Sequence, residues 1–381
     1  MGLKIRSIDF RNFRSYERFF LDDIGELTIF IGRNAIGKTN LLEGIQLVTA
    51  ASSFRHPQVS QVIRDGMPSG RVSMRSSDGN RDMLTELHLE TGKRKYTVNG
   101  KSKGISDVRG ILPAVVFSPD DLNLAKGSSS VKRSAFDEVG VQLSRNYSVI
   151  GRDFEKALRY KNRLLKEEAP QPLVDAINET FVACGAQLFC YRHALYRTMS
   201  GMVAEGYGDI ARSGEGLSVD YTPSWDHLRN REEEACFCWL EEESLSDRDA
   251  VREVMHEAIA RYSGQERARH RALVGPHNDK ISFLVNGKEA SQFASQGQQR
   301  SIVLAWKLAE VEMVRRMLGT EPVLLLDDVM SELDSYRRDM LVGNVTAETQ
   351  TFITATDLTP FNEELLERAR IVDLEKLAES R

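Results

Sequence analysis

Apolar side chains mark strands and one helix in the first fifty residues. Residues 3–10 alternate apolar and polar side chains, and residues 26–31 contain the apolar run Leu27-Thr28-Ile29-Phe30-Ile31, which stops at Gly32. A run of this length predicts a buried strand. Helical spacing then separates the apolar residues Leu41, Leu42, Ile45 and Val48. The predicted order is therefore strand, glycine loop, helix.

The middle of the chain changes from strand-like to helical patterning. Between about residues 71 and 117, short β-like runs alternate with turn residues, including Asn99-Gly100, a preferred two-residue hairpin turn. We expect a small sheet there. Beyond Phe117-Ser118-Pro119 the pattern is helical until about residue 270. Apolar side chains from Ile177 to Met199 step by four and three, which predicts a long helix with one buried face.

The last third of the chain returns to strand-like runs at residues 281–285, 323–327 and 351–355, separated by helical segments. This alternation is typical of a parallel sheet covered by helices. The pattern therefore predicts an α/β fold in which both chain ends build one lobe and a helical lobe is inserted between them. We expect lobe I to contain residues 1–120 and 270–381, and lobe II to contain residues 121–269.

Composition agrees with an ordinary soluble globular protein. The chain has 381 residues, of which 41% are hydrophobic and 28% charged, so two or three compact units with a real core are expected. An apolar run near the roughly 20 residues that a bilayer requires is missing from the sequence, which excludes a membrane span. The first residues give no secretory signal, so we expect a cytoplasmic protein.

Charge and cysteine usage narrow the possible partners. The net charge is −5, from 51 basic and 56 acidic side chains, so a polyanion such as DNA must be held by a local patch. The cysteines form no CxxC pair and have no matching histidine spacing, which argues against zinc and against a disulfide framework. We expect reduced packing residues at Cys184, Cys190, Cys236 and Cys238.

The loop between the predicted strand and helix carries phosphate-binding chemistry. The segment Gly32-Arg33-Asn34-Ala35-Ile36-Gly37-Lys38-Thr39 fits the pattern GxxxxGK[ST]. Glycines let backbone N–H groups surround phosphate oxygens, Lys38 neutralises the β and γ phosphates, and the Thr39 hydroxyl can bind Mg²⁺. The alternative, a plain glycine turn, is disfavoured by the flanking strand and helix.

Two carboxylates follow a second buried run, Pro322-Val323-Leu324-Leu325-Leu326. A buried parallel strand would deliver Asp327 and Asp328 to the carboxyl edge of the sheet, where ligands of open α/β folds bind. Asp327 would then complete the Mg²⁺ shell, and Asp328 would orient or deprotonate the attacking water. Two aspartates after a buried strand are weak evidence for a nucleotide site when they stand alone, because many strands end in acidic residues. In a chain that also has a phosphate loop they are strong evidence.

A third polar segment, Ser295-Gln296-Gly297-Gln298-Gln299-Arg300, precedes an apolar-periodic helix. A serine and a glycine at a helix start expose an anion site of the same physical kind as the phosphate loop. The alternative is a helix cap with no ligand. If the segment faces outward, a second subunit can use it.

These motifs, in this order, resemble the RecF family of bacterial recombination mediator ATPases. The resemblance rests on GRNAIGKTNLLE, SQGQQR, LLLDDVMSELD and TATD, with IDFRNFRSY, FSPDDLNLAKG and GPHNDK between them, and covers nearly the whole chain. It implies an ABC-type P-loop ATPase head of the SMC kind, with a short helical lobe in place of a coiled coil. It also implies an ATP-dependent homodimer that binds single- and double-stranded DNA at gaps and junctions.

The same resemblance implies a role in DNA replication, recombinational repair and the SOS response, with RecR as partner and with RecO and RecA downstream. ATP and Mg²⁺ are the implied cofactors, and the implied activity is weak, DNA-stimulated hydrolysis of ATP to ADP and phosphate. The alternative is an SMC-like or nuclease-linked P-loop ATPase with another DNA role. A transport ATPase is disfavoured because Thr356 stands where transporters place a switch histidine.

The resemblance assigns site residues one by one. Lys38 and Asp328 are the catalytic pair, and Thr39 and Asp327 are the metal ligands. The segment Ser331-Glu332-Leu333-Asp334 matches a loop across the dimer. Nucleotide contacts fall on Gly32, Asn34, Gly37, Lys38, Thr39 and Asn40, and on the partner-facing signature residues Ser295, Gly297 and Gln298.

Three features depart from the family pattern, and no switch glutamine is identified by spacing. Asn278 and Lys280 replace the commoner arginine and aspartate, and Ser129-Ser130 interrupts a usual proline. An aspartate at 328, where most cassette ATPases have glutamate, together with Thr356 favours slow turnover.

Two basic segments are candidate DNA surfaces; the alternative for both is a solvated face, and for the helix also a surface for a partner protein. The first is one face of a helix, and its charges step by four and three: Arg152, Lys156, Arg159, Arg163 and Lys166. The second flanks the Asn-Gly turn and contains Lys93, Arg94, Lys95, Lys101 and Lys103. Because no interleaved aromatic residues mark a base-stacking platform, we expect readout of phosphate and shape, not of sequence.

Overall fold

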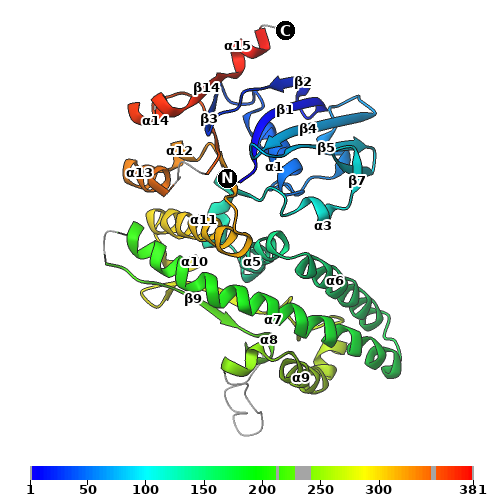
Figure 1. Cartoon of the computed structure of the whole chain (residues 1–381). Coiled ribbons are helices and arrows are strands. Elements are labelled where there is room, and N and C mark those ends of the chain that lie inside the picture. Colours follow the sequence, from blue (N-terminus) through cyan, green and yellow to red (C-terminus); the bar gives the residue numbers. More distant parts are fainter. Residues whose placement is uncertain (1, 212–213, 228–241, 345–348, 380–381) are drawn as a thin grey trace. The chain divides into compact units, whose positions relative to one another are not determined.

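The computed structural model describes residues 2–211, 214–227, 242–344 and 349–379, which form two compact units (Figure 1). The first unit contains Met1–Asp121 and Trp306–Arg381, and the second contains Leu122–Ala305. The chain therefore returns to the first unit at Trp306, whereas the apolar pattern predicts this return at residue 270. The physical reason is strand pairing, since residues 280–285 pair with a strand of the second unit.

Strands from both chain ends form a parallel sheet in the first unit. All four strand pairs are parallel, and the order is β14-β3-β13-β12-β8. Every residue of β12 and β13 is buried, as expected for a parallel sheet covered on both faces. The strands are β3 (Leu27–Ile31), β8 (Ala114–Phe117), β12 (Val323–Asp327), β13 (Thr351–Ala355) and β14 (Arg370–Asp373).

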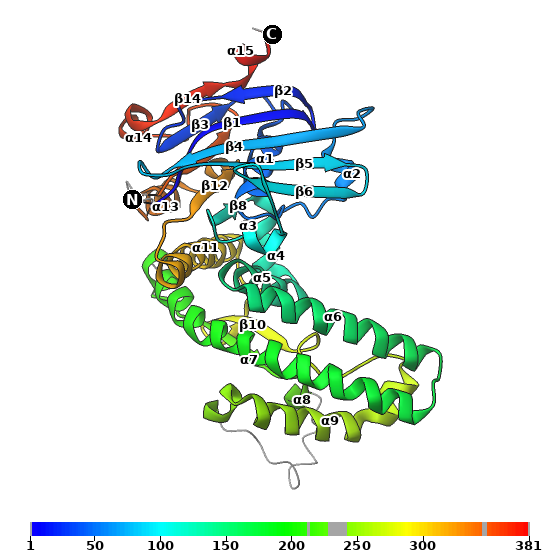
Figure 2. The ribbon, with the colours of Figure 1, turned by 45° about the vertical axis from the view of Figure 1, so that its right-hand side comes forward.

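The second sheet of this unit is antiparallel, in the order β2-β1-β4-β5-β6-β7 (Figure 2). The predicted hairpin is confirmed, because β6 and β7 pair around Asn99 and Gly100, which both have positive φ, as a type I′ turn requires. The strands are β1 (Lys4–Phe13), β2 (Tyr16–Leu21), β4 (Ser69–Ser77), β5 (Asp82–Glu90), β6 (Lys93–Val98) and β7 (Lys101–Lys103).

Helix α1 (Lys38–Thr49) packs against strands of both sheets and is buried along almost its whole length. Gly44 permits this close packing, because a Cβ there would lie 2.5 Å from the Phe10 ring. Gln350 also joins the two sheets, since its side chain accepts from the Ile5 N–H and donates to the carbonyls of Ile5 and Gly25. Helix α1 therefore packs closely against two sheets that are themselves joined.

The remaining helices of the first unit are short. They are α2 (Val59–Val62), α3 (Ile105–Val108), η1 (Pro119–Asp121), α12 (Val329–Glu332), α13 (Ser335–Asn344), α14 (Glu363–Arg368) and α15 (Leu374–Glu379). Helix α11 (Gln296–Leu318) begins in the second unit and continues into the first.

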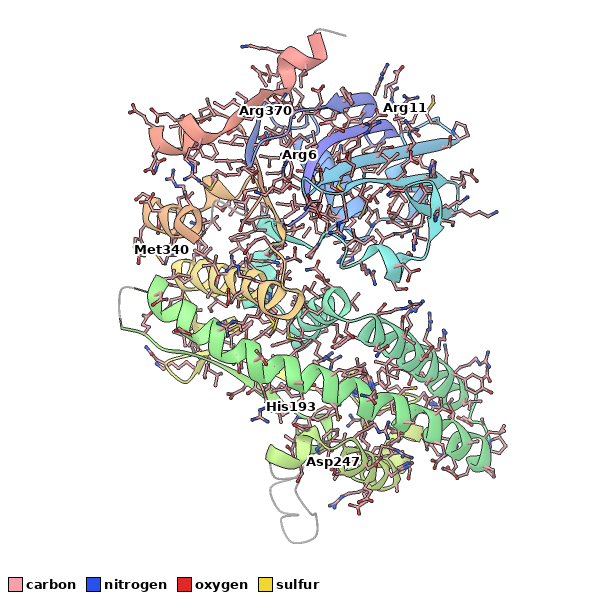
Figure 3. All side chains as sticks on the ribbon, in the orientation of Figure 1. Arg6, Arg11, His193, Asp247, Met340 and Arg370 are labelled. Atoms are coloured by element: carbon pink, nitrogen blue, oxygen red, sulfur yellow. The ribbon has the colours of Figure 1, made fainter. Side chains whose placement is uncertain are left out.

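The second unit is built around the 40-residue helix α7 (Gln171–Ile210), which confirms the predicted long helix. Helices α6 (Arg145–Lys166) and α9 (Arg248–Ala268) pack along it, and His193, labelled in Figure 3, stacks on Phe189 inside the core. Asp247, also labelled, caps the start of α9 by accepting from two backbone N–H groups. The other helices are α4 (Leu122–Lys126), α5 (Ser129–Leu143), α8 (Ser224–His227), η2 (Glu242–Ser246) and α10 (Ala290–Phe293).

A small antiparallel sheet corrects two expectations for the second unit. The run at 281–285 is a strand, β10 (Lys280–Val285), but it pairs with β9 (Leu217–Thr222) and β11 (Lys288–Glu289) instead of joining the parallel sheet. Strand β9 interrupts the region expected to be helical. Alternation over only six residues is a weak signal between two long helical segments, which explains why the pattern missed it.

Two residues that depart from the family pattern, Asn278 and Ser129, form hydrogen bonds inside the second unit. The Asn278 side chain donates to the carbonyls of Ala272 and Leu273, and Ser129 bonds to the backbone of β10. Asp279 is fully buried and accepts from the Tyr221 hydroxyl and the Ser224 N–H. These bonds hold the loop before β10 in place.

The cysteines agree in part with the prediction. Cys184 and Cys190 are free thiols, and burial raises the pKa of Cys190 to about 11, as expected of unreactive packing residues. Cys236 and Cys238 lie outside the described residues. Among the described residues, no helix is both long and apolar enough to cross a bilayer.

One buried ion pair yields a stability prediction. Lys161 and Glu266 are 2.8 Å apart with side chains 0% and 2% exposed, and Glu266 also accepts from the Leu273 N–H. Burial lowers the pKa of Lys161, and the Glu266 carboxylate opposes that shift. Glu266→Ala strands a buried charge and should lower the free energy of unfolding by about 3–5 kcal/mol.

Urea denaturation followed by circular dichroism measures this loss, with Glu253→Ala on the exposed side of α9 as the control. A loss below about 1 kcal/mol for Glu266→Ala, the scale of an exposed pair, would mean that water reaches Lys161.

Candidate nucleotide site

The phosphate loop leaves β3 and enters α1 through a backbone that requires glycine. Gly37, the residue before α1, has φ 112° and ψ 10°, in the left-handed region. A Cβ there would lie 2.8 Å from the Ser15 Oγ and 3.0 Å from the Tyr16 hydroxyl. Both the conformation and the space therefore exclude other residues at this position. Asn34 lies exposed in the same loop.

Lys38 is 7% exposed, and its ammonium donates to the Gly32 carbonyl at 2.6 Å. The side chain thus folds back over the loop instead of extending into solvent. A cation in this position, at the N-terminus of a buried helix, creates a strong local field for anions. Burial raises the pKa of Asp328, and the charge of Lys38 opposes that shift, so this charge reaches the second carboxylate of the site.

Thr39 and Asp327 meet as the sequence predicts. The Thr39 hydroxyl donates to Asp327 Oδ1 at 3.1 Å, although 288 residues separate them. Burial raises the pKa of Asp327, so a nearby cation would stabilise its ionised form. A hydroxyl and a carboxylate are hard oxygen ligands, and Mg²⁺ takes one or two such protein ligands together with substrate phosphates. The pair therefore fits Mg²⁺.

Thr354 is a site residue that the sequence reasoning missed. Its hydroxyl donates to Asp327 Oδ1 at 2.9 Å and accepts from the Asp328 N–H at 2.9 Å. The parallel register places Thr354 beside Asp327 on the neighbouring strand. A signal existed in the sequence, because a polar residue inside the buried run of β13 needs a hydrogen-bond partner.

Asp328 has the environment of a proton acceptor. Burial raises its pKa, and the carboxylates of Glu332 and Asp357 raise it further, against the lowering effect of Lys38. A raised pKa makes a carboxylate a better general base near neutral pH. Its backbone is left-handed, with φ 54°, a conformation that aspartate tolerates and that often occurs at functional sites.

Asn40 holds neighbouring groups of the site together. Its amide donates to the Ser15 Oγ at 3.1 Å and its carbonyl oxygen accepts from Arg55 at 2.9 Å. Arg55 lowers the pKa of Asp327 and lies 3.6 Å from the buried carboxylate of Glu43. This arginine is a second cation of the site, and its position in the loop after α1 gave no motif by which to find it.

The motif after β12 is also ordered. The Ser331 hydroxyl donates to the Asp328 carbonyl at 2.8 Å, and Asp334 accepts from the Arg337 N–H at 2.9 Å at the start of α13. Thr356 is exposed just beyond β13 and contacts Asp357. These residues continue the carboxyl edge of the sheet on which Asp327 and Asp328 lie.

Ser295, Gly297 and Gln298 come together in the second unit at the start of α11. The Gln298 N–H donates to the Ser295 Oγ at 3.2 Å, and the Ser295 N–H donates to Gln298 Oε1 at 2.7 Å. These reciprocal bonds form a capping box, so the expected helix cap is present. The cap does not remove the anion site, since the exposed serine hydroxyl still carries a proton to donate.

Comparison with known proteins agrees with this assembly of motifs. The model of the RecF/RecN/SMC N terminal domain matches residues 4–374. The DNA replication and repair protein RecF of Bacillus cereus (strain B4264) is 31% identical over 374 residues, covering 97% of this chain and 96% of that protein.

Solved structures agree as well. The structure of the recombination mediator protein RecF-ATPrS in the RecFOR pathway superposes with a TM-score of 0.84 and 26% identity, covering 95% of this chain and 94% of that one. A Smc head domain from Pyrococcus furiosus, 13% identical, has a TM-score of 0.51 and shows the fold alone. The fold is that of an ABC-type ATPase head, and the chain belongs to the RecF family.

Proposed function

We propose that this protein is an ATP-dependent, dimerising ATPase of DNA recombinational repair. The observation that carries the proposal is the convergence of Lys38, Thr39, Asp327 and Asp328 at one edge of the parallel sheet. This set contains a phosphate-neutralising cation, a pair of oxygen ligands for Mg²⁺ and a carboxylate with a raised pKa. Hydrolysis of a nucleoside triphosphate needs these three elements.

Each residue has a defined role in the proposed reaction. Lys38 would neutralise charge on the β and γ phosphates, and Thr39 and Asp327 would hold Mg²⁺. Bound Mg²⁺ would neutralise the developing charge on the phosphate oxygens. Asp328 accepts the proton of the attacking water or orients it, and the Thr354 hydroxyl fixes the backbone of Asp328 for this task.

The proposal includes a composite site in an ATP-dependent homodimer. Ser295 is exposed at the N-terminus of a 23-residue helix, where backbone N–H groups favour anions. A second copy of the chain could present the γ-phosphate of its nucleotide to this site. A symmetric dimer would then contain two such sites.

DNA is the proposed macromolecular partner, at gaps and single-strand/double-strand junctions, in the cytoplasm. RecR, together with RecO, is the proposed protein partner in loading RecA. Relatives described as replication and repair proteins, and a recombination mediator of the RecFOR pathway, support this choice. Hydrolysis is proposed to be slow and stimulated by DNA.

The two basic segments differ in how many of their charges form ion pairs with acidic side chains. The helix stripe is exposed on α6, but Lys156, Arg159 and Arg163 each lie within 4.0 Å of an acidic side chain. On the hairpin, Lys93, Lys95, Lys101 and Lys103 are exposed and form no ion pair with the residues that the structure describes. Charges that form no ion pair bind phosphates without first breaking one, and this holds for Lys93 even though Glu90 is its register partner on β5. We therefore favour the hairpin as the DNA surface.

The hairpin lysines divide between two faces of the sheet. Lys101 and Lys103 pair with Val98 and Tyr96, so they share the face that Tyr96 presents to the core. Strand alternation places Lys93 and Lys95 on the opposite face. The two pairs therefore provide separate tests of which face contacts DNA.

The first test of this function concerns Asp328. Asp328→Asn should retain nucleotide binding and slow hydrolysis by about 10²–10⁴, the scale of a lost general base, so an ATP-bound dimer should accumulate. Phosphate release and size-exclusion chromatography with ATP measure both effects. Hydrolysis at the parental rate would reduce Asp328 to a structural acid. DNA that is cut during the assay would instead favour a nuclease-linked ATPase.

The second test concerns the composite site. Ser295→Arg should leave the monomer folded and able to bind ATP, while dimerisation and hydrolysis fail together because the anion site is filled. Lys38→Ala should lose ATP-dependent dimerisation through the other half of the site. Mixed in equal amounts, the two variants form one intact composite site per heterodimer, and activity should partly return. Unchanged ATP binding by Lys38→Ala would contradict the assignment of the phosphate loop.

The third test measures the DNA surface by salt dependence. Each lost phosphate contact should flatten the slope of log affinity against log salt by about 0.9. Lys93→Glu/Lys95→Glu and Lys101→Glu/Lys103→Glu probe the two hairpin faces, and Arg159→Glu/Arg163→Glu makes the same charge change on α6. We expect one hairpin variant to flatten the slope by about two on gapped duplex and the α6 variant to leave it unchanged. The reverse result would move the DNA surface to α6.

A further inference from the structure

A carboxylate outside every motif holds the Ser295–Gln298 capping box. Gln298 Nε2 donates to Glu215 Oε1 at 2.9 Å, while Gln298 Oε1 accepts from the Ser295 N–H at 2.7 Å. The two ends of one amide group are thus bonded to partners 80 residues apart in the chain. Glu215 lies just before β9 and is half-buried.

Glu215 is itself anchored on the interior of the second unit. Its Oε2 accepts from the hydroxyl of Tyr207 at 3.2 Å, and Tyr207 is fully buried in α7. The next residue, Gly216, exchanges two 2.9 Å bonds with Asn286, so the backbone at this point is joined to the β9–β10 sheet. The Glu215 carboxylate therefore ties the start of α11 to the core of the second unit.

The chemistry of the contact determines which way the Gln298 amide points. An ionised carboxylate only accepts hydrogen bonds, so Glu215 selects the orientation in which the amide NH₂ group faces it. The amide oxygen must then face the Ser295 N–H. A flipped amide would place two donors against each other at Ser295 and two acceptors against each other at Glu215, and the capping box would open.

The capping box in turn sets the direction of the Ser295 hydroxyl. Because the Ser295 Oγ accepts from the Gln298 N–H, its own O–H group is left to donate in another direction. No acceptor for that proton occurs among the hydrogen bonds of the described residues. The hydroxyl is therefore available to an incoming anion, beside the N-terminal N–H groups of α11.

We propose that Glu215 is a positioning residue for the nucleotide bound by a second copy of the chain. It locks Gln298, through Gln298 it orients the Ser295 hydroxyl, and in this way it prepares the helix start to accept the γ-phosphate. This inference rests on the proposed function, since the ligand is the triphosphate held by Lys38 of the other copy. Glu215 itself does not touch the nucleotide.

The test compares Glu215→Ala with the conservative Glu215→Gln. Glutamine can accept from Gln298 and donate to the Tyr207 oxygen, so Glu215→Gln should behave as the parent. Glu215→Ala removes both bonds and should weaken ATP-dependent dimerisation by about 10-fold or more, as expected for a lost hydrogen bond to a charged group. Monomer affinity for ATP should stay unchanged in both variants, because Lys38 and Thr39 are untouched.

Analytical ultracentrifugation with and without ATP measures dimerisation, equilibrium binding measures ATP affinity, and the thermal midpoint reports folding. A second measurement separates positioning from general destabilisation. Glu215→Ala mixed with Lys38→Ala should regain activity, since the intact signature comes from one subunit and the intact phosphate loop from the other. A variant that is merely unstable would lower activity in every mixture.

The outcomes distinguish this inference from the proposed function. If Ser295→Arg abolishes dimerisation while Glu215→Ala dimerises as the parent does, the positioning role is wrong and the composite site stands. If Ser295→Arg also dimerises normally, the composite site itself is wrong. Equal loss of dimerisation in Glu215→Ala and Glu215→Gln would likewise overturn the positioning role, because the geometry is conserved in the second variant.

Discussion

The burial of α1 between two sheets is the constraint on which the nucleotide site depends. A helix covered on all sides cannot shift, so the loop before it keeps one shape. Gly44 allows the Phe10 ring to approach the helix, and Gly37 allows the chain to turn into it past Ser15 and Tyr16. Rigid packing far along α1 therefore positions backbone N–H groups and Lys38 at its first turn.

The Thr354 side chain bonds to both aspartates at the end of β12, to the carboxylate of Asp327 and to the backbone of Asp328. Asp327 is bonded by the hydroxyls of Thr39 and Thr354, and Asp328 by its backbone N–H to Thr354. One threonine thus connects the proposed metal ligand to the proposed general base. Burial raises the pKa of both aspartates, and the neighbouring Asp328 carboxylate raises the pKa of Asp327 further.

The second unit uses buried polar groups in a different way, to fix loops instead of binding a ligand. Arg192 is 3% exposed on its side chain and bonds to Asp137 and to the Pro276 carbonyl. Asp279, Tyr221 and Ser224 complete a network that holds the chain before β10. The capping box of Ser295 and Gln298 comes after β10 in the chain. Glu215, which supports it, lies beside β9, so the capping box and the β9–β10 sheet belong to one framework.

The amino-acid sequence by itself determined the phosphate loop, the strand with Asp327 and Asp328, and the long helix α7. These depend on local spacing, and local spacing is a property of consecutive residues. The Asn-Gly hairpin was predictable for the same reason, since its turn needs two residues that accept positive φ.

Only the tertiary structure decided that β10 pairs with β9, that Thr354 joins the two aspartates and that Glu215 supports Gln298. Each of these contacts joins residues that are 26 or more positions apart, through a single hydrogen bond or strand pairing. Such contacts arise from how packed elements meet, and no periodic pattern in the sequence encodes them. The ion pairs on α6 are the opposite case, because they join residues only three or four positions apart, and the spacing of acidic and basic residues in the sequence already contains them.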